Sequence, residues 1–166
     1  MYSISKKIKV ALLGITLTTA ASGLHAQNVS VNADWEGHKA DKICYAVSFP
    51  TPDSAASSHV VSSRYITVTH RPDEGIKNEI AFVSGFPEEF SIEGSVTIDN
   101  NLPYKLLSYK GVGFVQSGDK EATLSSQMRA GKVMEVKWTT PNGEYFVDRY
   151  SLIGFTSTHN FINNCG

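Results

Sequence analysis

The sequence predicts a mostly β protein: an antiparallel β-sandwich, or a barrel-like relative, with one short inserted helix and a short C-terminal helix. Three observations indicate this fold class. Short segments of alternating apolar and polar residues recur along the chain, Gly-, Pro- and Asn-rich turns separate them, and only two segments have a helical pattern. Many short strands with frequent turn signals are typical of antiparallel sandwiches and barrels.

Residues 1–26 have the pattern of a secretory signal peptide. Lys6, Lys7 and Lys9 precede an apolar run at residues 10–21, and the small residue Ala26 follows it closely. A basic segment, a short apolar segment and a small residue at the cleavage site define such peptides. The run is shorter than the ~20 residues of a spanning helix, so a signal anchor is less favoured, as is a buried helix. We therefore expect cleavage after Ala26, export to the periplasm and no transmembrane segment in the mature chain.

The mature chain, residues 27–166, has the length of one domain. Three of the 15 lysines and arginines lie in the signal peptide and none of the 16 acidic residues does, which leaves a net charge of about −4. The acidic residues are scattered, and neither a basic stripe nor a polybasic segment is present. Nucleic acid and anionic lipid surfaces are therefore not expected as partners.

The two cysteines, Cys44 and Cys165, both lie in the mature chain. An even number of cysteines in an oxidising compartment predicts a disulfide, and two unpaired thiols are the less favoured alternative. The bridge would close a loop of about 120 residues and would require the two Cα atoms to lie within about 7 Å. The C-terminal tail must therefore fold back onto an early strand.

The N-terminal half of the mature chain predicts strands separated by loops. We expect a short strand at 29–33 and a polar loop at 35–41, with Trp35 as its one apolar anchor. Residues 43–49 are rich in the β-branched and aromatic residues that favour strands. Pro50, Pro52 and the Ser-rich run at 54–63 then predict a long exposed loop.

The middle of the chain continues the strand pattern. At 64–70, Tyr65, Thr67 and Thr69 fall on one face and Ile66 and Val68 on the other, which is strand periodicity. The composition of 71–75 indicates a turn. Further strands are expected at the following segments: 79–83, 95–98, 104–109 and 112–116.

A helix and a hairpin are expected next. Asp119 is the predicted helix cap, Leu124 and Met128 are four residues apart on one face, and Gly131 is the usual stop. A hairpin follows, with strands at 133–138 and 145–150 joined by an Asn-Gly turn. Its first strand alternates so that Met134, Val136 and Trp138 share a face, and 156–164 predicts the short C-terminal helix.

The sequence carries no motif of a known chemistry. The mature chain has four histidines, His38, His59, His70 and His159, and none is spaced as paired metal ligands are. Isolated surface histidines are the more common case. A nucleophile elbow, a phosphate-binding loop, a dinucleotide fingerprint and a CxxC pair are all absent from the sequence. We therefore expect no catalytic residues, no metal and no organic cofactor.

Asp148 and Arg149 leave two interpretations open. Neighbouring residues in a strand point to opposite faces, so one of the two would face the core and need a partner there. Alternatively the strand lies at the edge of the sheet, and this second interpretation is the preferred one.

Two segments of the C-terminal half form a recognisable pattern: residues 124–136 (LSSQMRAGKVMEV) and 148–155 (DRYSLIGF). They resemble the helix, strand, hairpin and Ser-Leu-x-Gly-Phe segment of the invasion-associated locus B family of exported α-proteobacterial proteins. Trp35, Cys44 with its neighbours, and 96–99 (VTID) also fall where the family has similar residues. Many members carry a second cysteine pair, whereas the matching stretch at 107–112 (LSYKGV) has none. The resemblance attaches no catalytic activity to any residue.

These observations predict a periplasmic or envelope-associated binding protein whose partner is an envelope component or a host surface. One alternative is a periplasmic hydrolase with a site assembled from scattered residues, which a pocket holding histidine and carboxylates would favour. Another is a chaperone-like structural factor, which an exposed strand edge would favour. A flat apolar patch would favour the binding protein.

Overall fold

The computed structural model describes residues 29–52, 54, 64–86, 92–116 and 118–165. The predicted signal peptide and most of the predicted Ser-rich loop lie outside these residues. The described strands form one antiparallel sheet in the order β1-β2-β3-β4-β5-β8-β7-β6-β9-β10. Their bounds are β1 Val29–Asn32, β2 Trp35–Ala40, β3 Ile43–Ser48, β4 Tyr65–Arg71, β5 Ile76–Val83, β6 Glu93–Ile98, β7 Tyr104–Tyr109, β8 Val112–Val115, β9 Val133–Thr139 and β10 Tyr145–Ser151.

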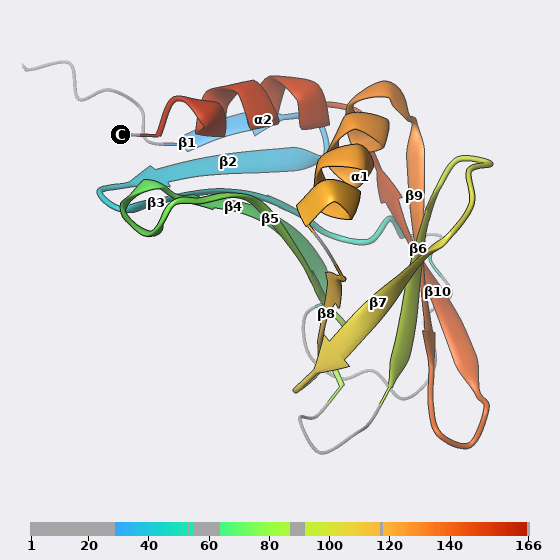
Figure 1. The fold of residues 1–166 in the computed structure, drawn as a ribbon. Coiled ribbons are helices and arrows are strands. Elements are labelled where there is room, and N and C mark those ends of the chain that lie inside the picture. Colours follow the sequence, from blue (N-terminus) through green and yellow to red (C-terminus); the bar gives the residue numbers. More distant parts are fainter. Residues whose placement is uncertain (1–28, 53, 55–63, 87–91, 117, 166) are drawn as a thin grey trace, which may run out of the picture.

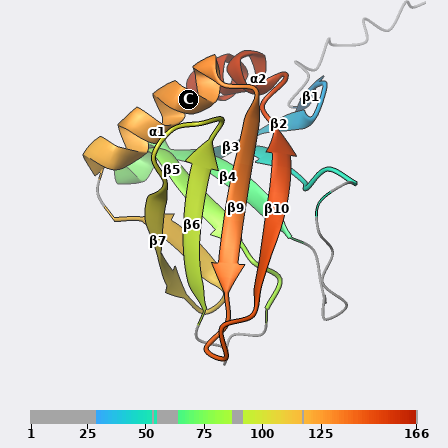
Figure 2. The ribbon, with the colours of Figure 1, turned by 90° about the vertical axis from the view of Figure 1, so that its right-hand side faces the viewer.

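The sheet is folded into two layers. Strands β1 to β5 form one layer, and β7, β6, β9 and β10 form the other, with the short β8 between them (Figure 1). Figure 2 shows the second layer face on, with both helices at one end of it. Helix α2 (Phe155–Asn163) packs on β1, β2 and β3, and helix α1 (Gly118–Ala130) packs on β5, β8 and α2. The predicted mostly β, sandwich-like class with an inserted and a C-terminal helix is therefore confirmed.

The sheet is not closed, because β1 and β10 do not pair with each other. The outer edge of β10 is nevertheless occupied by hydrogen bonds. The N–H of Thr51 donates to the carbonyl of Arg149 (2.7 Å), whose own N–H donates to Ser54 Oγ (2.9 Å). The indole Nε1–H of Trp35 donates to the carbonyl of Ser151 (2.9 Å). These bonds hold the first layer against the last strand and satisfy an edge that would otherwise be open to a further strand.

One apolar core fills the space between the layers and beneath the helices. It confirms the predicted alternation of β4 and β9, because Ile66 and Val68 are buried, as are Met134, Val136 and Trp138. Its largest side chains with essentially no exposed surface are Trp35, Trp138, Tyr150, Phe82, Phe155, Ile66, Ile80, Ile98, Leu106, Leu124, Met128 and Met134.

Two glycines make room for the ring of Trp138. Gly94 lies opposite Trp138 in the β6–β9 pair, and a Cβ there would lie 2.7 Å from Trp138 Cζ3. A Cβ at Gly113 on β8 would lie 2.8 Å from Trp138 Cη2. The indole therefore extends from β9 across the inner face of β6 to β8, over strand backbone that carries no side chain.

Replacing Gly94 with alanine is expected to destabilise the protein by about 1–3 kcal/mol, because the added methyl group overpacks the core against a ring that cannot move aside. Urea unfolding of the mature protein measures the change. Gly118→Ala is the matched control, since a Cβ at Gly118 has open space around it and alanine favours the helix. A Gly94→Ala variant as stable as the Gly118→Ala variant would contradict this packing.

Residues 35–41, expected as a loop, form strand β2 instead. Trp35 and Gly37 are buried beneath α2, whereas Glu36 and His38 lie on the other face. A Cβ on Gly37 would lie 2.8 Å from the ring of Phe161, so that ring occupies the place of a side chain. The residues of β2 do alternate between the two faces of the sheet. The buried face, however, carries Gly37 in place of an apolar side chain, so the apolar periodicity that predicts a strand is absent from the sequence.

The start of α1 also differs slightly from the prediction. The helix begins at Gly118, so Asp119 lies in its first turn and does not cap it. Its carboxylate still lies at the positive end of the helix dipole, where acidic side chains are favoured. The helix ends at Ala130, immediately before the predicted stop at Gly131.

Candidate functional site

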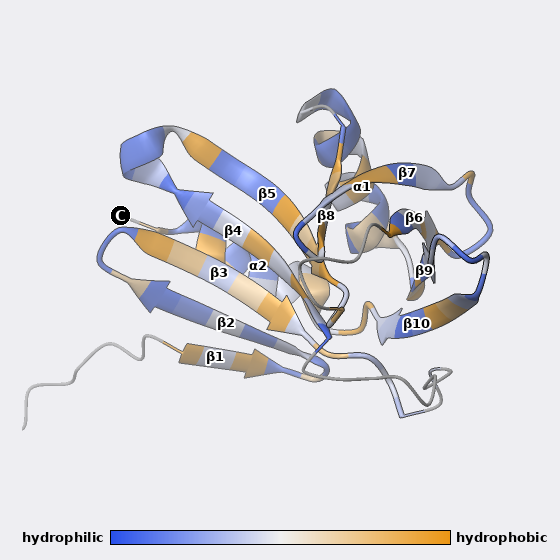
Figure 3. Ribbon diagram, turned by 90° about the horizontal axis from the view of Figure 1, so that it is seen from below, coloured by the Kyte–Doolittle hydropathy of each residue, from blue (hydrophilic) through white to orange (hydrophobic). Residues whose placement is uncertain are grey.

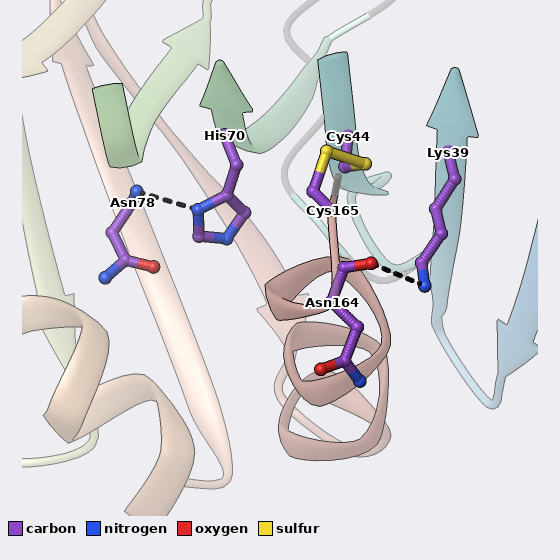
Figure 4. The surroundings of a disulfide bond; sticks show 6 residues. All are labelled: Lys39, Cys44, His70, Asn78, Asn164 and Cys165. Atoms are coloured by element: carbon purple, nitrogen blue, oxygen red, sulfur yellow. Dashed lines mark hydrogen bonds between the residues drawn. A yellow bond between two sulfur atoms is a disulfide. The ribbon is translucent and has the colours of Figure 1, made fainter. Parts of the chain in front are cut away.

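Cys44 and Cys165 form the predicted disulfide, with their Cα atoms 5.8 Å apart. Cys44 is buried on β3, and Cys165 follows α2 (Figure 4). Beside the bridge, Lys39 Nζ on β2 donates a hydrogen bond to the carbonyl of Asn164 (3.1 Å). Lys39 Nζ also lies over the ring of Phe161 (4.4 Å), so covalent, polar and ring contacts all fix the C-terminal end of α2 to the first layer.

Next to this bridge two histidines are buried, so the expectation of isolated surface histidines is wrong for them. His70 is the cross-strand partner of Cys44, and His159 lies on α2 with its ring centroid 5.8 Å from that of His70. Their exposed fractions are 4% and 3%. His70 continues the buried alternation of β4, and His159 shares the buried face of α2 with Phe155 and Ile162.

The hydrogen bonds of the cluster define the tautomer of each ring. His159 Nε2 lies 2.7 Å from Oδ1 of Asn78, which can only accept, and Asn163 Nδ2 lies 3.1 Å from His159 Nδ1. The proton of His159 is therefore on Nε2, and Nδ1 accepts from Asn163. In His70, Nδ1 accepts the backbone N–H of Asn78 (3.4 Å; Figure 4). Its proton is then on Nε2, which has no hydrogen-bond partner among the described residues.

Burial keeps both imidazoles neutral. The pKa of His159 is lowered to about 4, mainly by burial and in smaller part by the electrostatic effects of Arg129, His70 and Lys77. The pKa of His70 is lowered by burial and by the charge of Lys77. Glu121, the nearest acid on α1, accepts the backbone N–H of Ile80 (3.2 Å). Among the described residues, the hydrogen-bond partners of the two rings are Asn78 and Asn163, and neither is a carboxylate.

A hollow of about 390 Å³ opens above this cluster, and we call it the interhelix hollow. It lies where α1, α2 and the start of β5 meet. Its described lining contains one imidazole, one guanidinium, two hydroxyls and one amide, and no carboxylate. The lining residues are Asn78, Ala122, Ser125, Ser126, Arg129, Ala130 and His159.

Asp148 is a further buried ionisable group, and the structure confirms both interpretations of this segment. Strand β10 lies at the edge of the sheet, and Asp148 faces the core with an exposed fraction of 0% and forms an ion pair with Arg64. Arg149 points to the other face and pairs with Glu135 (2.8 Å). Burial raises the pKa of Asp148 to about 6 although Arg64 opposes the shift. One carboxylate oxygen, Oδ2, has no hydrogen-bond partner among the described residues.

The sheet face opposite the helices carries apolar side chains across five adjacent strands. Cross-strand pairing places one row through β3, β4, β5, β8 and β7 and a second row through β4, β5, β8 and β7. We call this surface the open face. The first row consists of Val47, Thr67, Ala81, Phe114 and Leu107, and the second of Tyr65, Val83, Val112 and Tyr109.

No described helix covers the open face, which is the side seen in Figure 3 for β3, β4 and β5. Leu107 and Tyr109 at its β7 end have exposed fractions of 52% and 71%. At its β3 end, the exposed Phe49 lies beside Tyr65, with ring centroids 6.3 Å apart. The other members of the two rows are partly buried, so the exposed side chains at both ends continue into a surface that is mostly apolar. A contiguous apolar surface of this kind is typical of an interaction site.

Comparison with family models, with curated proteins and with solved structures gives no match for this chain. The class of this protein is therefore taken from its own described fold. It is a two-layered, mostly β domain whose C-terminal helix is anchored by a disulfide, with a buried histidine cluster and an apolar open face. None of the described helices has the length and apolar character needed to cross a membrane.

The sequence predicted the disulfide correctly and left the burial of Asp148 open as one of two interpretations, but the burial of His70 and His159 was not predicted. A signal was present for each of these three residues. His70 and Asp148 occupy the buried phase of alternating strands, and His159 falls four residues after Phe155 on an apolar helix face. Periodicity thus indicated their burial, whereas residue type alone suggested the surface.

Proposed function

We propose that this protein is an exported, periplasmic or envelope-associated binding protein, similar in kind to the invasion-associated locus B proteins. Its contact surface is the open face, and its partner is an apolar surface of another envelope protein. The observation that carries this proposal is the pair of apolar rows across β3, β4, β5, β8 and β7, which no described helix covers.

The composition of the open face favours a protein as the partner. Aromatic residues are enriched at the centres of protein interfaces, where charged residues are depleted. The two rows contain three aromatic residues and no formal charge: Tyr65, Tyr109 and Phe114 are the aromatic members. A polyanion would instead require a basic surface.

Two further observations support binding over the alternatives. The interhelix hollow contains a histidine but no carboxylate among its described lining residues, which disfavours a hydrolase. The edge of β10 is occupied by hydrogen bonds and the β1 edge is only four residues long, which disfavours a chaperone that captures strands. The disulfide supports export, since structural disulfides persist in oxidising compartments.

Introducing charge into the open face is expected to abolish partner binding without unfolding the protein. We expect the Leu107→Asp/Tyr109→Asp variant to retain its circular dichroism spectrum, because both side chains are exposed. Its recovery of envelope proteins in a pull-down from the native envelope fraction should fall about tenfold or more, because two buried charges would replace two apolar contacts in the interface. Quantitative mass spectrometry of the captured proteins measures this.

The matched control is Leu102→Asp, which charges a leucine that is 87% exposed but lies outside the two rows. This variant should capture the same proteins as the wild type. If the open-face variant and the wild type recovered the same proteins in equal amounts, the open face would not be the contact surface.

A further inference from the structure

We propose that the interhelix hollow binds a small anion that carries a carboxylate or phosphate group. This site lies on the helix side of the sheet, away from the open face, so it does not depend on the function proposed above. It is formed where α1 and α2 meet over the start of β5, and its volume of about 390 Å³ suits a small molecule.

The polar groups of the lining point to an acceptor-rich ligand. Arg129 is exposed on α1, and its Nη2 donates to Asn160 Oδ1 on α2 (3.3 Å), which holds the guanidinium between the helices. A guanidinium has five N–H donors in a fixed fork that matches a carboxylate or a phosphate. The hydroxyls of Ser125 and Ser126 line the same hollow.

Asn78 adds a further donor because of the histidine cluster behind it. Its Oδ1 is taken by the Nε2–H of His159, so only its amide N–H groups are left for the hollow. These N–H groups form no hydrogen bond among the described residues. The buried cluster therefore fixes an amide with its donor side available, which an acceptor such as an anionic oxygen would satisfy.

The charges around the hollow favour an anion over a cation. Arg129 is the one formally charged group in the described lining, and Lys77 is near enough to act on both histidines. Two acids on the same elements lie outside the lining. The carboxylate of Glu79 is balanced by Arg71, whose Nη groups donate to it (3.1 and 3.2 Å), and the carboxylate of Glu121 accepts the backbone N–H of Ile80 on β5 (3.2 Å).

Titration of the oxidised mature protein with inorganic phosphate and, separately, with acetate tests this site. Amide and histidine-ring NMR signals report binding, with sodium chloride holding the ionic strength constant. We expect saturable shifts at the lining residues with at least one of the two anions. Binding of acetate alone would identify a carboxylate site, and binding of phosphate alone would identify a phosphate site.

Arg129→Gln should weaken that binding about tenfold or more, since it removes a charge-assisted contact. Lys120→Gln makes the same change in net charge on the same helix, outside the lining, and should leave the affinity unchanged. The proposal fails if neither anion gives saturable shifts, or if both variants weaken binding equally, as non-specific electrostatic attraction would.

Discussion

Removing the Cys44–Cys165 disulfide is expected to lower the free energy of unfolding by about 4–5 kcal/mol. The bridge spans 121 residues, and cross-linking so long a loop restricts the unfolded chain strongly in the chain-entropy model. For a domain of this length the melting midpoint should fall by roughly 10–20 °C. Urea and thermal unfolding of a Cys44→Ala/Cys165→Ala variant measure both quantities.

Two controls separate the covalent link from the contacts beside it. Lys39→Met removes the exposed hydrogen bond to the Asn164 carbonyl and the contact of Nζ with the ring of Phe161 (4.4 Å), and should cost less than about 1 kcal/mol. Wild-type protein treated with a reductant should behave like the double variant. Hydrogen exchange should accelerate in α2, whose end is then held by non-covalent contacts alone. A loss of less than about 1 kcal/mol in the double variant would contradict a stabilising role for the bridge.

Sequence patterns predicted those parts of the fold that depend on neighbouring residues. The hairpin of β9 and β10 follows from alternation on both sides of Asn142 and Gly143, and α1 follows from Leu124, Met128 and the glycine after its last turn. The disulfide was predictable because the sequence contains only two cysteines. In each case a local rule or a simple count was sufficient.

The buried polar groups were not predictable in this way, because distant segments bring them together. His159 meets Asn78 across 81 residues, and Arg64 meets Asp148 across 84. Neither contact has a sequence spacing that would indicate it. Strand β2 was missed for a related reason: Gly37 faces the core, but its space is filled by Phe161 from the other end of the chain.

The two buried sites respond to pH in opposite directions. The pKa of His159 is lowered to about 4, so its contribution to stability is present above pH 6.5 and is lost as the pH falls through about 4. The pKa of Asp148 is raised to about 6 in the folded protein, so its contribution is full below pH 3.8 and is lost as the pH rises through about 6. The two effects oppose each other between pH 4 and 6, which explains why a variant is needed to observe either one.

Arg64→Met is expected to destabilise the protein by about 3–5 kcal/mol at pH 7, because it leaves the carboxylate of Asp148 buried without its counter-charge. Losing Arg64 also removes the group that opposes the upward shift, so the pKa of Asp148 should rise above about 6. The folded variant then binds a proton more readily than the unfolded chain does. Its stability deficit should therefore shrink as the pH falls from 7 to 5, as measured by urea unfolding at both pH values.

Two matched variants show whether Asp148 causes this behaviour. Arg149→Met removes the neighbouring arginine, whose partner Glu135 is partly exposed, and should cost less than about 1 kcal/mol at either pH. Arg64→Met/Asp148→Asn has no carboxylate to protonate at this position, so the recovery at pH 5 should be absent from it. The same recovery in the double variant would assign the effect to another group, because the remaining ionisable groups are identical in the two proteins. An Arg64→Met variant equally destabilised at both pH values would instead show that the arginine acts mainly through its packing on Phe146, over whose ring it lies at 5.5 Å.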